Sequence, residues 1–467
     1  MSKKFREYKG LNLTDVADET LQFWEDNDIF QKSIDSRDPN KPFVFFEGPP
    51  SANGLPGIHH VMGRAIKDIF CRYKTLQGFQ VKRKAGWDTH GLPIELGVEK
   101  ELGITKEDIG KKITVEEYNE ACKNAVMRYT DVWEDLTRKM GHWVDMNDPY
   151  VTYRPKYMET LWWLLKQMYS KKLLYKGYTI QPYSPKAGTG LSSHELNQPG
   201  TYQDITDTTI VAQFKVKPQS EQERPLPFAK DLIGQLYFLA WTTTPWTLPS
   251  NTALTVGKKI DYVLVKTFNQ YTFEPVNVIL AKSLVHVQFD KKFNEVSLEE
   301  DLNAYKGDVS QSGGKAGKIP YFISETYKGQ ELLEIKYEQL LPYALPYQNA
   351  ENAFRVIAGD FVTTEDGTGI VHTAPTFGAD DAMVAKQAKP EVPPMLVLDN
   401  NNNPVPLVDL QGKFTKHMGE HAGKYVKNEY YEEGTAPDRS VDVEIAIRLK
   451  EENKAFKVEK YKHSYRS

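Results

Sequence analysis

The sequence contains very little cysteine. Cys71 and Cys122 are the only two among 467 residues, too few for a disulfide framework or for a zinc site built from three or four thiolates. We therefore expect a reducing compartment and no protein-bound zinc. The amino terminus lacks the apolar run of about 7 to 15 residues that marks a secretory signal, and no segment has the roughly 20 apolar residues of a bilayer span. Both absences favour a cytoplasmic protein that does not contact a membrane.

Neither sign of charge dominates, and no internal repeat is present. Lys plus Arg number 59 and Asp plus Glu 63, a net charge of −4, so any contact with nucleic acid must be a local patch. Basic residues at 82–84, 111–112 and 171–172 could follow a nucleic-acid backbone or could be solvated faces. The length predicts about three domains, and 40% hydrophobic residues are enough for sizeable cores.

Helix and strand patterns alternate over the first 180 residues. The glycine- and proline-rich segment 48–57 separates an apolar run from a helical pattern, which predicts a βαβ unit whose ligands bind at the carboxyl ends of its strands. Thr14 or Asp15 could begin the first helix, and Thr114 with Glu117 forms a capping box ahead of a long helix that Gly141 can stop. The predicted helices cover 13–30, 61–73, 114–140 and 157–174, and the predicted strands 43–46 and 79–83.

After about residue 180 the pattern changes to strands separated by turns, which predicts a β-rich domain. Loops are expected where Pro, Gly, Ser, Gln or Asn gather, at 217–227 and 308–320, with a turn or linker at 399–404. The predicted strands include 210–216, 236–241, 262–265 and 276–280.

The segment 48–57 suits a phosphate group. Its three glycines and three prolines allow a ligand to approach the main chain closely. His59 and His60 stand where the following helix begins, and a helix amino terminus offers free N–H groups and a partial positive charge. One interpretation is a site for a nucleotide polyphosphate. The other is a tight turn whose histidines only cap the helix.

The motif GPPSANGLPGIHH, followed by Asp88 in GWDTHGLPIELG, resembles the front half of the class I aminoacyl-tRNA synthetases, and their isoleucine branch in particular. In that family the first signature is His-x-Gly-His, whose imidazoles meet the ATP phosphates. Here Gly57, Ile58, His59 and His60 occupy those positions, so the first and third are exchanged. We hypothesise that His59 supplies, from its shifted position, the imidazole that Gly57 lacks.

The resemblance implies an α/β fold, the first half of a Rossmann-like nucleotide-binding domain, and a site for ATP, its Mg²⁺ and L-isoleucine. A carboxylate at the carboxyl end of a strand suits an ammonium group; the alternative is that Asp88 only caps a turn. The implied ATP-binding residues are Gly48, Asn53, Gly54, Gly57, His59 and His60, the last two catalytic, and the implied amino-acid-binding residues are Pro49, Asp88 and His90.

A second pair of motifs lies in the β-rich part. LAWTTTPWTLPSNTA places three hydroxyls directly after a predicted strand, and because neighbouring residues alternate faces, at least one should be free for a ligand; alone, it could be an ordinary strand edge. With GTGIVHTAPTFGADD it resembles the editing insertion of isoleucyl, valyl and leucyl enzymes. The resemblance implies that Thr242, Thr243, Thr244 and Asn251 hold the 3′ adenosine and the ester, that His372 helps to exclude the larger correct side chain, and that Asp381 binds the α-ammonium.

Hydrolysis in such an insertion would use a positioned water, because the sequence has no apparent Ser-His-Asp or Cys-His pairing. Thr376-Phe377-Gly378 stands where some relatives carry a histidine, which leaves that part of the pocket open. The need for editing is known from this same family, where one missing methylene changes selectivity only about 10- to 200-fold.

The resemblance implies four parts: a helical extension (1–40), half of the catalytic domain (41–185), a β-barrel-like editing domain (186–405) and the end of the insertion (406–467). The implied function is charging of tRNA(Ile) with isoleucine and hydrolysis of Val-tRNA(Ile), by a protein expected to be a monomer. The second signature, the KMSKS loop, is absent, so we expect a fragment with little ATP–pyrophosphate exchange and weak deacylation. The alternatives are a freestanding trans-editing deacylase and a non-catalytic tRNA-binding module.

Overall fold

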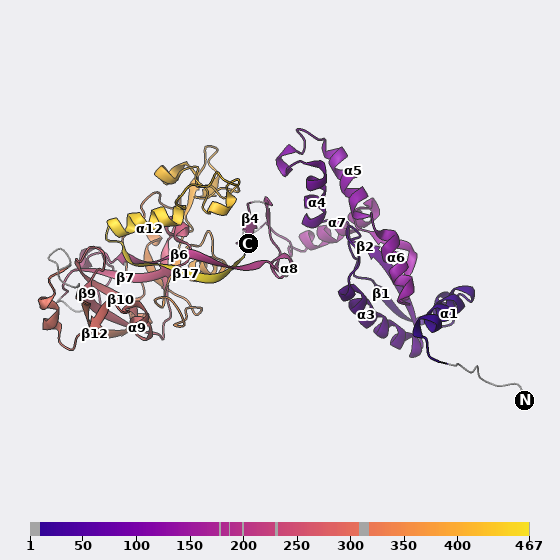
Figure 1. Ribbon diagram of the computed structural model, residues 1–467, viewed down its shortest axis with the longest axis horizontal. Helices are drawn as coiled ribbons and strands as arrows, with labels where there is room; N and C mark the ends of the chain where they lie inside the picture. The colour runs from indigo at the N-terminus through magenta and orange to yellow at the C-terminus, as the bar shows by residue number, and fades with distance from the viewer. Residues whose placement is uncertain are drawn as a thin grey trace, which may run out of the picture. The chain divides into compact units, whose positions relative to one another are not determined.

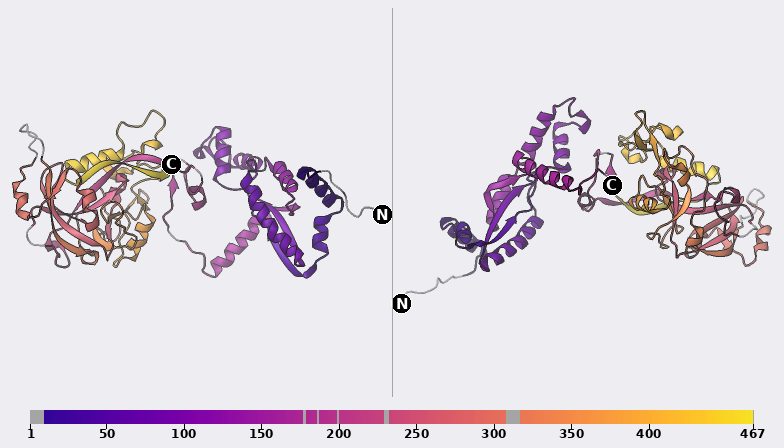
Figure 2. Two further views of the ribbon diagram at one scale, coloured as in Figure 1. Left: turned by 60° about the horizontal axis from the view of Figure 1, so that its bottom comes forward. Right: turned by 180° about the vertical axis from the view of Figure 1, so that it is seen from behind.

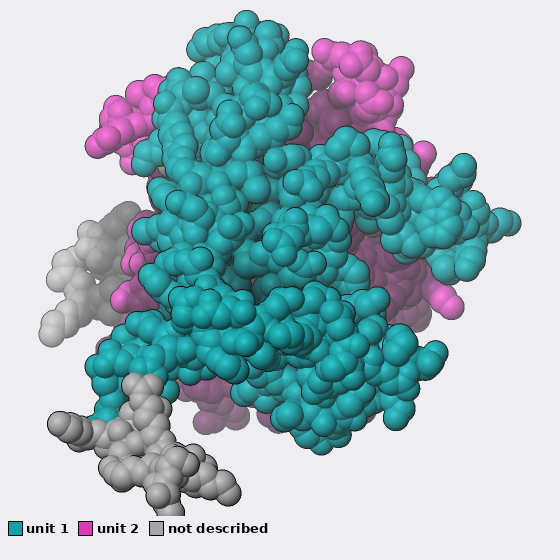
Figure 3. Space-filling model, turned by 90° about the vertical axis from the view of Figure 1, so that its right-hand side faces the viewer, with its two compact units in different colours: residues 1–177 teal, residues 178–467 magenta. Residues whose placement is uncertain are grey.

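A computed structural model (Figure 1) describes residues 10–176, 179–185, 187–198, 200–228, 232–307 and 317–466. The chain divides into two compact units, residues 1–177 and 178–467, coloured separately in Figure 3. Within the described ranges, none of the helices combines the length and apolar character needed to cross a bilayer.

A three-stranded parallel sheet forms the centre of the first unit, in the order β1-β2-β3. Parallel neighbours require a crossover, which α3 provides between β1 and β2; this helix packs beside β2 (Figures 1 and 2). Gly86 allows β3 to approach, because a Cβ there would lie 2.4 Å from the Tyr150 ring. The strands are β1 Asp38–Phe46, β2 Phe79–Trp87 and β3 Asp145–Val151. The βαβ unit is therefore confirmed, with both predicted strands longer than expected.

Two predicted long helices of this unit are wrong, because each is two helices. The first breaks at Asn27 and Asp28, where Asp28 has a φ of 50°, and Asn12 rather than Thr14 or Asp15 caps it. The second begins with the expected capping box of Thr114 and Glu117 but breaks before Tyr129, whose N–H bonds outside the helix. The helices are α1 Leu13–Asp26, α2 Ile29–Asp35, α3 Ile58–Leu76, α4 Leu92–Leu102, η1 Lys106–Asp108, α5 Val115–Val126, α6 Thr130–Lys139 and α7 Pro155–Ser170.

A branched ten-stranded sheet dominates the second unit. Eight strands follow the order β11-β12-β9-β10-β7-β14-β8-β13, and the long antiparallel pair β6 and β17 joins through β7. Alternate residues of β7 enter two different cores: Leu236, Phe238 and Ala240 one, Tyr237 and Leu239 the other. The strands are β6 Tyr202–Lys215, β7 Gln235–Thr242, β8 Ala253–Val256, β9 Asp261–Phe268, β10 Pro275–Ala281, β11 Phe293–Glu295, β12 Ile319–Lys328, β13 Arg355–Ala358, β14 Ile370–Thr373 and β17 Ala455–Arg466.

Short elements surround this sheet, and α12 lies along β6 and β17 (Figure 1). The turn expected at 399–404 is confirmed, since it joins β15 to β16. The loop expected at 217–227 includes η2, and residues 308–316 of the other expected loop lie outside the described residues. The remaining elements are β4 Tyr183–Ser184, β5 Thr189–Gly190, α8 Ser193–Leu196, η2 Gln219–Glu221, η3 Pro245–Ser250, η4 Lys282–Leu284, α9 Val285–Gln288, η5 Glu299–Ala304, α10 Gly329–Leu332, η7 Ala350–Asn352, α11 Ala379–Gln387, β15 Leu396–Leu398, β16 Pro404–Pro406, η8 Lys416–His421, η9 Asn428–Tyr430 and α12 Val441–Glu451. The mixed α/β class is as expected.

Candidate functional site

Main-chain carbonyl groups of the loop 48–57 attach it to the rest of the first unit. Every second carbonyl from Pro50 to Gly54 accepts a hydrogen bond from a different part of the first unit, and Ala52 is buried against Trp87 and Trp133. A loop tied at three points keeps one conformation, as a ligand site requires. The three donors are the Asp88 N–H to Pro50 O at 3.0 Å, the Tyr129 N–H to Ala52 O at 3.0 Å, and Trp133 Nε1–H to Gly54 O at 2.8 Å.

His60 lies in the first turn of α3, and its hydrogen bond determines which ring nitrogen carries the proton. Its Nδ1 accepts a hydrogen bond from the Gly57 N–H at 2.9 Å, so the neutral ring carries its proton on Nε2. Burial, reinforced by the neighbouring charges of His59 and Arg64, lowers the pKa of His60 below its ordinary 6.5. The edge of Trp133 fixes the ring, with centroids 4.7 Å apart. His60 therefore has one N–H available for an external acceptor.

His59 folds back over Gly57. The two histidine rings lie 3.8 Å apart, centroid to centroid. A Cβ added at Gly57 would lie 2.9 Å from Cε1 of His59, closer than side-chain carbons approach. The position of the His59 ring thus depends on the absence of a side chain at Gly57.

Asp88 follows β2 and lies beside the loop, since its N–H bonds Pro50. Its half-buried carboxylate accepts from the His90 N–H at 3.4 Å, and no Lys or Arg of the described ranges forms an ion pair with it. Thr152, at the end of β3, holds the neighbouring residues: it bonds Thr89 through both main chain and side chain, and His90 Nδ1 at 3.0 Å. The carboxylate is consequently fixed without being neutralised.

The structure thus brings the loop and Asp88 together, at the carboxyl ends of adjacent parallel strands. Pro49, Asn53 and Gly54 are half-buried, Gly48 is exposed, and His90 is exposed beside them. Sequence reasoning missed Trp133 and Thr152, which carry the supporting hydrogen bonds. Thr152 had a usable signal, because it directly follows a strand that ends at the same edge of the sheet.

In the second unit, the three threonines form a turn at the end of β7. Thr242 Oγ1 accepts from the Thr244 N–H at 3.1 Å and lies 3.3 Å from Thr244 Oγ1. Thr243 lies between them, and its side chain is half-buried. The turn therefore gathers hydroxyls at the start of η3.

A buried chain of hydrogen bonds supports this turn. Because Asn251 Nδ2 donates to His372 Nδ1 (2.8 Å), the ring carries its proton on Nε2 and donates it to Thr247 Oγ1 (3.0 Å), which donates to Thr244 O (2.8 Å). Tyr337 Oη donates to Asn251 Oδ1 at 2.7 Å. Burial lowers the pKa of His372 to about 4, so the ring is neutral. The polar atoms of Asn251 and His372 are thus engaged within the protein.

Asp381 lies in the first turn of α11. Its Oδ2 accepts from the Ala374 N–H at 2.9 Å, which joins α11 to the segment after β14. Burial raises the pKa of Asp381, opposed by that N–H and reinforced by Asp380. Close by in the sequence, Thr376 Oγ1 is buried without a hydrogen-bond partner, so the segment keeps polar groups beyond those needed for its own fold.

Sequence reasoning also missed a distant support for the threonine turn. Asp442, at the start of α12, accepts from the Trp246 N–H at 2.8 Å across 196 positions of the chain. Its other oxygen pairs with Lys427 at 3.1 Å, and Lys427 pairs with Asp207 at 3.1 Å. No local pattern could reveal this contact, because it depends on where α12 packs.

The chain is similar to known proteins over most of its length. Residues 19–366 match the family model described as tRNA synthetases class I (I, L, M and V). Isoleucine–tRNA ligases of Cytophaga hutchinsonii, Bacteroides fragilis and Porphyromonas gingivalis are 59%, 56% and 55% identical, over 98%, 100% and 100% of this chain. The chain spans about 40% of the length of each of these relatives.

Proposed function

Because the chain belongs to the class I tRNA synthetases of the I, L, M and V group, we propose that it is part of an isoleucyl-tRNA synthetase. Such an enzyme activates isoleucine with ATP, transfers it to tRNA(Ile), and hydrolyses mischarged Val-tRNA(Ile). The similarity to isoleucine–tRNA ligases at 55–59% identity supports this substrate. The observation that carries the proposal is the hydrogen bond between Asp88 and Pro50, which joins a phosphate-type loop to an unpaired carboxylate.

ATP would bind along the loop 48–57 and the first turn of α3. The Nε2–H of His60 and the folded-back ring of His59 supply donors at the helix terminus, where anions are favoured. Charge that develops on the α-phosphate would be stabilised by these fixed donors, while Mg²⁺ arriving with the nucleotide neutralises pyrophosphate. Because the His60 donor is pre-oriented by Gly57 and Trp133, it need not reorganise when the nucleotide binds.

Isoleucine would bind with its ammonium on Asp88 and its side chain against Pro49. A fixed, unneutralised carboxylate favours a cationic ligand, and a charged hydrogen bond is stronger than a neutral one. Its position beside the loop would bring the amino-acid carboxylate toward the α-phosphate, which is the geometry that adenylate formation requires.

Asp88→Asn tests this assignment. We expect isoleucine affinity to fall at least about tenfold, because a charge-assisted contact becomes a neutral one, while Mg·ATP affinity changes little. Isothermal titration of the chain with each ligand measures both. Asp148→Asn is the matched control, since the side chain of Asp148 is exposed and pairs with Lys84 away from the loop. Equal isoleucine binding by the wild type and Asp88→Asn would contradict the assignment.

The second unit would hydrolyse the mischarged ester. Thr242, Thr243 and Thr244 would surround the 3′ adenosine, and Asp381 would take the α-ammonium. Asn251, expected to contact the adenosine, is buried with its polar atoms engaged, so it would support the threonine turn through His372, which would limit the size of the side chain. With no nucleophilic side chain assigned to the reaction, water is the attacking group, held by the hydroxyls. The neutral state of His372 supports a structural and size-selecting role rather than that of a charged catalyst.

Asp381→Ala, compared with Asp380→Ala, tests the editing assignment within one helix turn. We expect Asp381→Ala to lower deacylation of Val-tRNA(Ile) about 100-fold, as misplacement of a substrate can do, whereas the exposed Asp380 is dispensable. Release of labelled valine from Val-tRNA(Ile), with Ile-tRNA(Ile) as the competing substrate, measures this. An unchanged rate in Asp381→Ala would exclude the residue from the site. Deacylation without any binding of ATP or isoleucine would instead favour a freestanding editing enzyme.

A further inference from the structure

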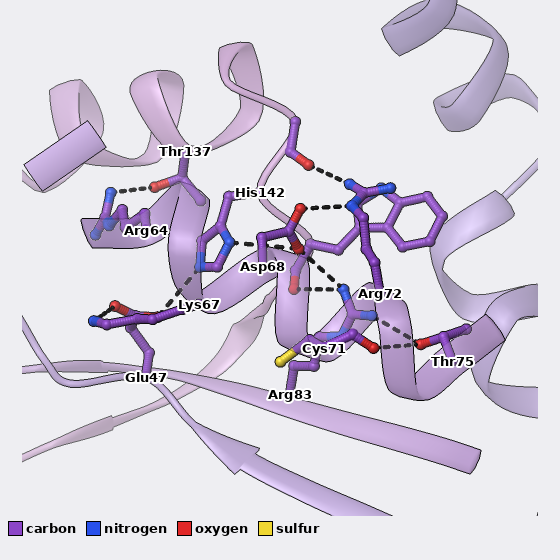
Figure 4. Close-up of polar contacts among 12 residues, drawn as sticks. Glu47, Arg64, Lys67, Asp68, Cys71, Arg72, Thr75, Arg83, Thr137 and His142 are labelled. Atoms are coloured by element: carbon purple, nitrogen blue, oxygen red, sulfur yellow. Dashed lines mark hydrogen bonds and ion pairs between the residues drawn. The ribbon is translucent and has the colours of Figure 1, made fainter. Parts of the chain in front are cut away.

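A cluster of charged residues, drawn in Figure 4, reaches the residue that precedes the loop. It includes Glu47, which directly follows β1 and precedes Gly48, the first residue of the loop. The main chain of Glu47 is held at both ends, because its N–H bonds Lys84 O and its carbonyl accepts from Tyr150 Oη. The side-chain carboxylate is only 3% exposed and pairs with Lys67 of α3 at 2.6 Å. Any movement of Glu47 is therefore transmitted to Gly48.

His142 is the second partner of this carboxylate. Its ring, 1% exposed, places Nε2 3.2 Å from Glu47 Oε2. Its Nδ1 faces Asp68 Oδ1 at 3.7 Å, an ion-pair distance that is long for a hydrogen bond. The main-chain N–H of His142 bonds Thr137 O of α6. His142 is therefore anchored to α6, while its ring faces the carboxylates of Glu47, which follows β1, and of Asp68 in α3.

Both ring nitrogens of His142 therefore face carboxylates, an arrangement that suits only the doubly protonated imidazolium. Burial alone would lower the pKa of His142, but Asp68 and Glu47 outweigh it and raise the pKa above its ordinary 6.5. The charged groups around the ring are Glu47 from the end of β1, Arg64, Lys67, Asp68 and Arg72 from α3, and Arg83 from β2, of which Arg72 and Arg83 pair with Asp68.

We propose that His142 is a positioning residue, which as an imidazolium joins Glu47 to Asp68 and so holds the loop 48–57 in the conformation that binds a nucleotide phosphate. The effect of His142 on ATP binding rests on the proposed function, whereas its effect on the conformation of the loop does not. A buried ion cluster contributes little more to stability than apolar packing would. Its place at the root of the loop is explained by positioning, because the cluster joins β1, α3 and the end of α6 at one residue.

The proposal predicts a specific pH dependence. Since the pKa of His142 is raised in the folded protein, its contribution is complete below about pH 6.5 and is lost as pH rises through the folded pKa. Glu47 behaves in the opposite way: burial opposes ionisation, but His142 and Lys67 lower its pKa, so its contribution is lost only in acid. The loop should consequently loosen at alkaline pH.

Hydrogen exchange of peptides covering 48–57, corrected for the intrinsic rate and measured from pH 6 to 9, tests the proposal without a ligand. In the wild type we expect protection to fall about tenfold across the titration of His142, the effect of losing one charge-assisted contact. His142→Gln should give low protection with no such step. His286→Gln is the control, because His286 is an exposed histidine of the other unit. The same step in His142→Gln would overturn the proposal.

Glu47→Gln provides a second variant in case His142→Gln does not fold. Removing that negative charge should move the midpoint of the wild-type step to lower pH, and an unmoved midpoint would also overturn the proposal. Titration with Mg·ATP across the same pH range separates the role of His142 in the loop from its effect on ATP binding. A loop that shows the step in a wild-type chain that does not bind ATP would count against the assignment of ATP to this loop and leave the role of His142 intact.

Discussion

At the scale of single residues, the exchange of Gly57 and His59 is the feature with the clearest physical consequence. The ring of His59 lies over Gly57, in space that it would have to leave if residue 57 carried a side chain. Local space therefore supports the hypothesis that His59 supplies the imidazole absent from position 57.

Reversing the exchange tests the hypothesis. We expect His59→Gly to weaken Mg·ATP binding about tenfold through loss of one charged-ligand contact, and Gly57→His alone to disturb the turn by its clash with His59. The double variant Gly57→His/His59→Gly should recover most of the affinity, because one imidazole is again present and the clash is gone. Calorimetric titration of the three variants measures this, and a double variant no better than the sum of the singles would refute the coupling.

At the scale of elements, the points at which helices begin and end separate local sequence signals from tertiary contacts. The capping box at Thr114 was predictable, because its signal is local. The end of α5 was not, because the Tyr129 N–H leaves the helix to bond Ala52 in the loop. A helix pattern in the sequence continues through this point, and only the tertiary contact gives the N–H a better partner.

The start of α12 is a comparable case, since Asp442 joins it to the threonine turn. We expect Asp442→Ala to destabilise the second unit by about 1–3 kcal/mol, because it removes the acceptor of the Trp246 N–H and one of the two carboxylates beside the buried Lys427, which keeps Asp207. Asp204→Ala should cost less than about 1 kcal/mol, since its pair with Lys462 is exposed. Urea unfolding of both variants gives the two free energies. Equal losses would mean that the Asp442 contact contributes no more than a surface pair.

At the scale of the whole molecule, the two units differ in how much apolar surface they bury. The second unit contains large cores on both faces of β7, whereas the first has a small core around Ala52, Trp87, Trp133 and Val151. Large apolar side chains of α3 remain exposed, among them Ile69 and Phe70, each at 65%. Exposed patches of this kind often contact other parts of a protein.

Because each unit has its own core, we expect the two units to unfold separately. Scanning calorimetry of the chain should show two transitions, because each unit has its own buried cluster. Residues 178–467 produced alone should reproduce the higher transition, since that unit buries the larger core. A single transition, shared by all probes, would show instead that the two units stabilise each other.

What the sequence alone determined is the chemistry of short motifs: the strand, loop and helix around His60, the acid after the next strand, the three threonines after β7, and the α/β class. These follow from local periodicity, from turn residues and from the rule that parallel strands end at one edge. The tertiary structure alone decided which groups hold those motifs in place. Tyr129, Trp133, His142, Thr152 and Asp442 act across tens to hundreds of positions, and such contacts depend on packing, which leaves no local signal in a single sequence.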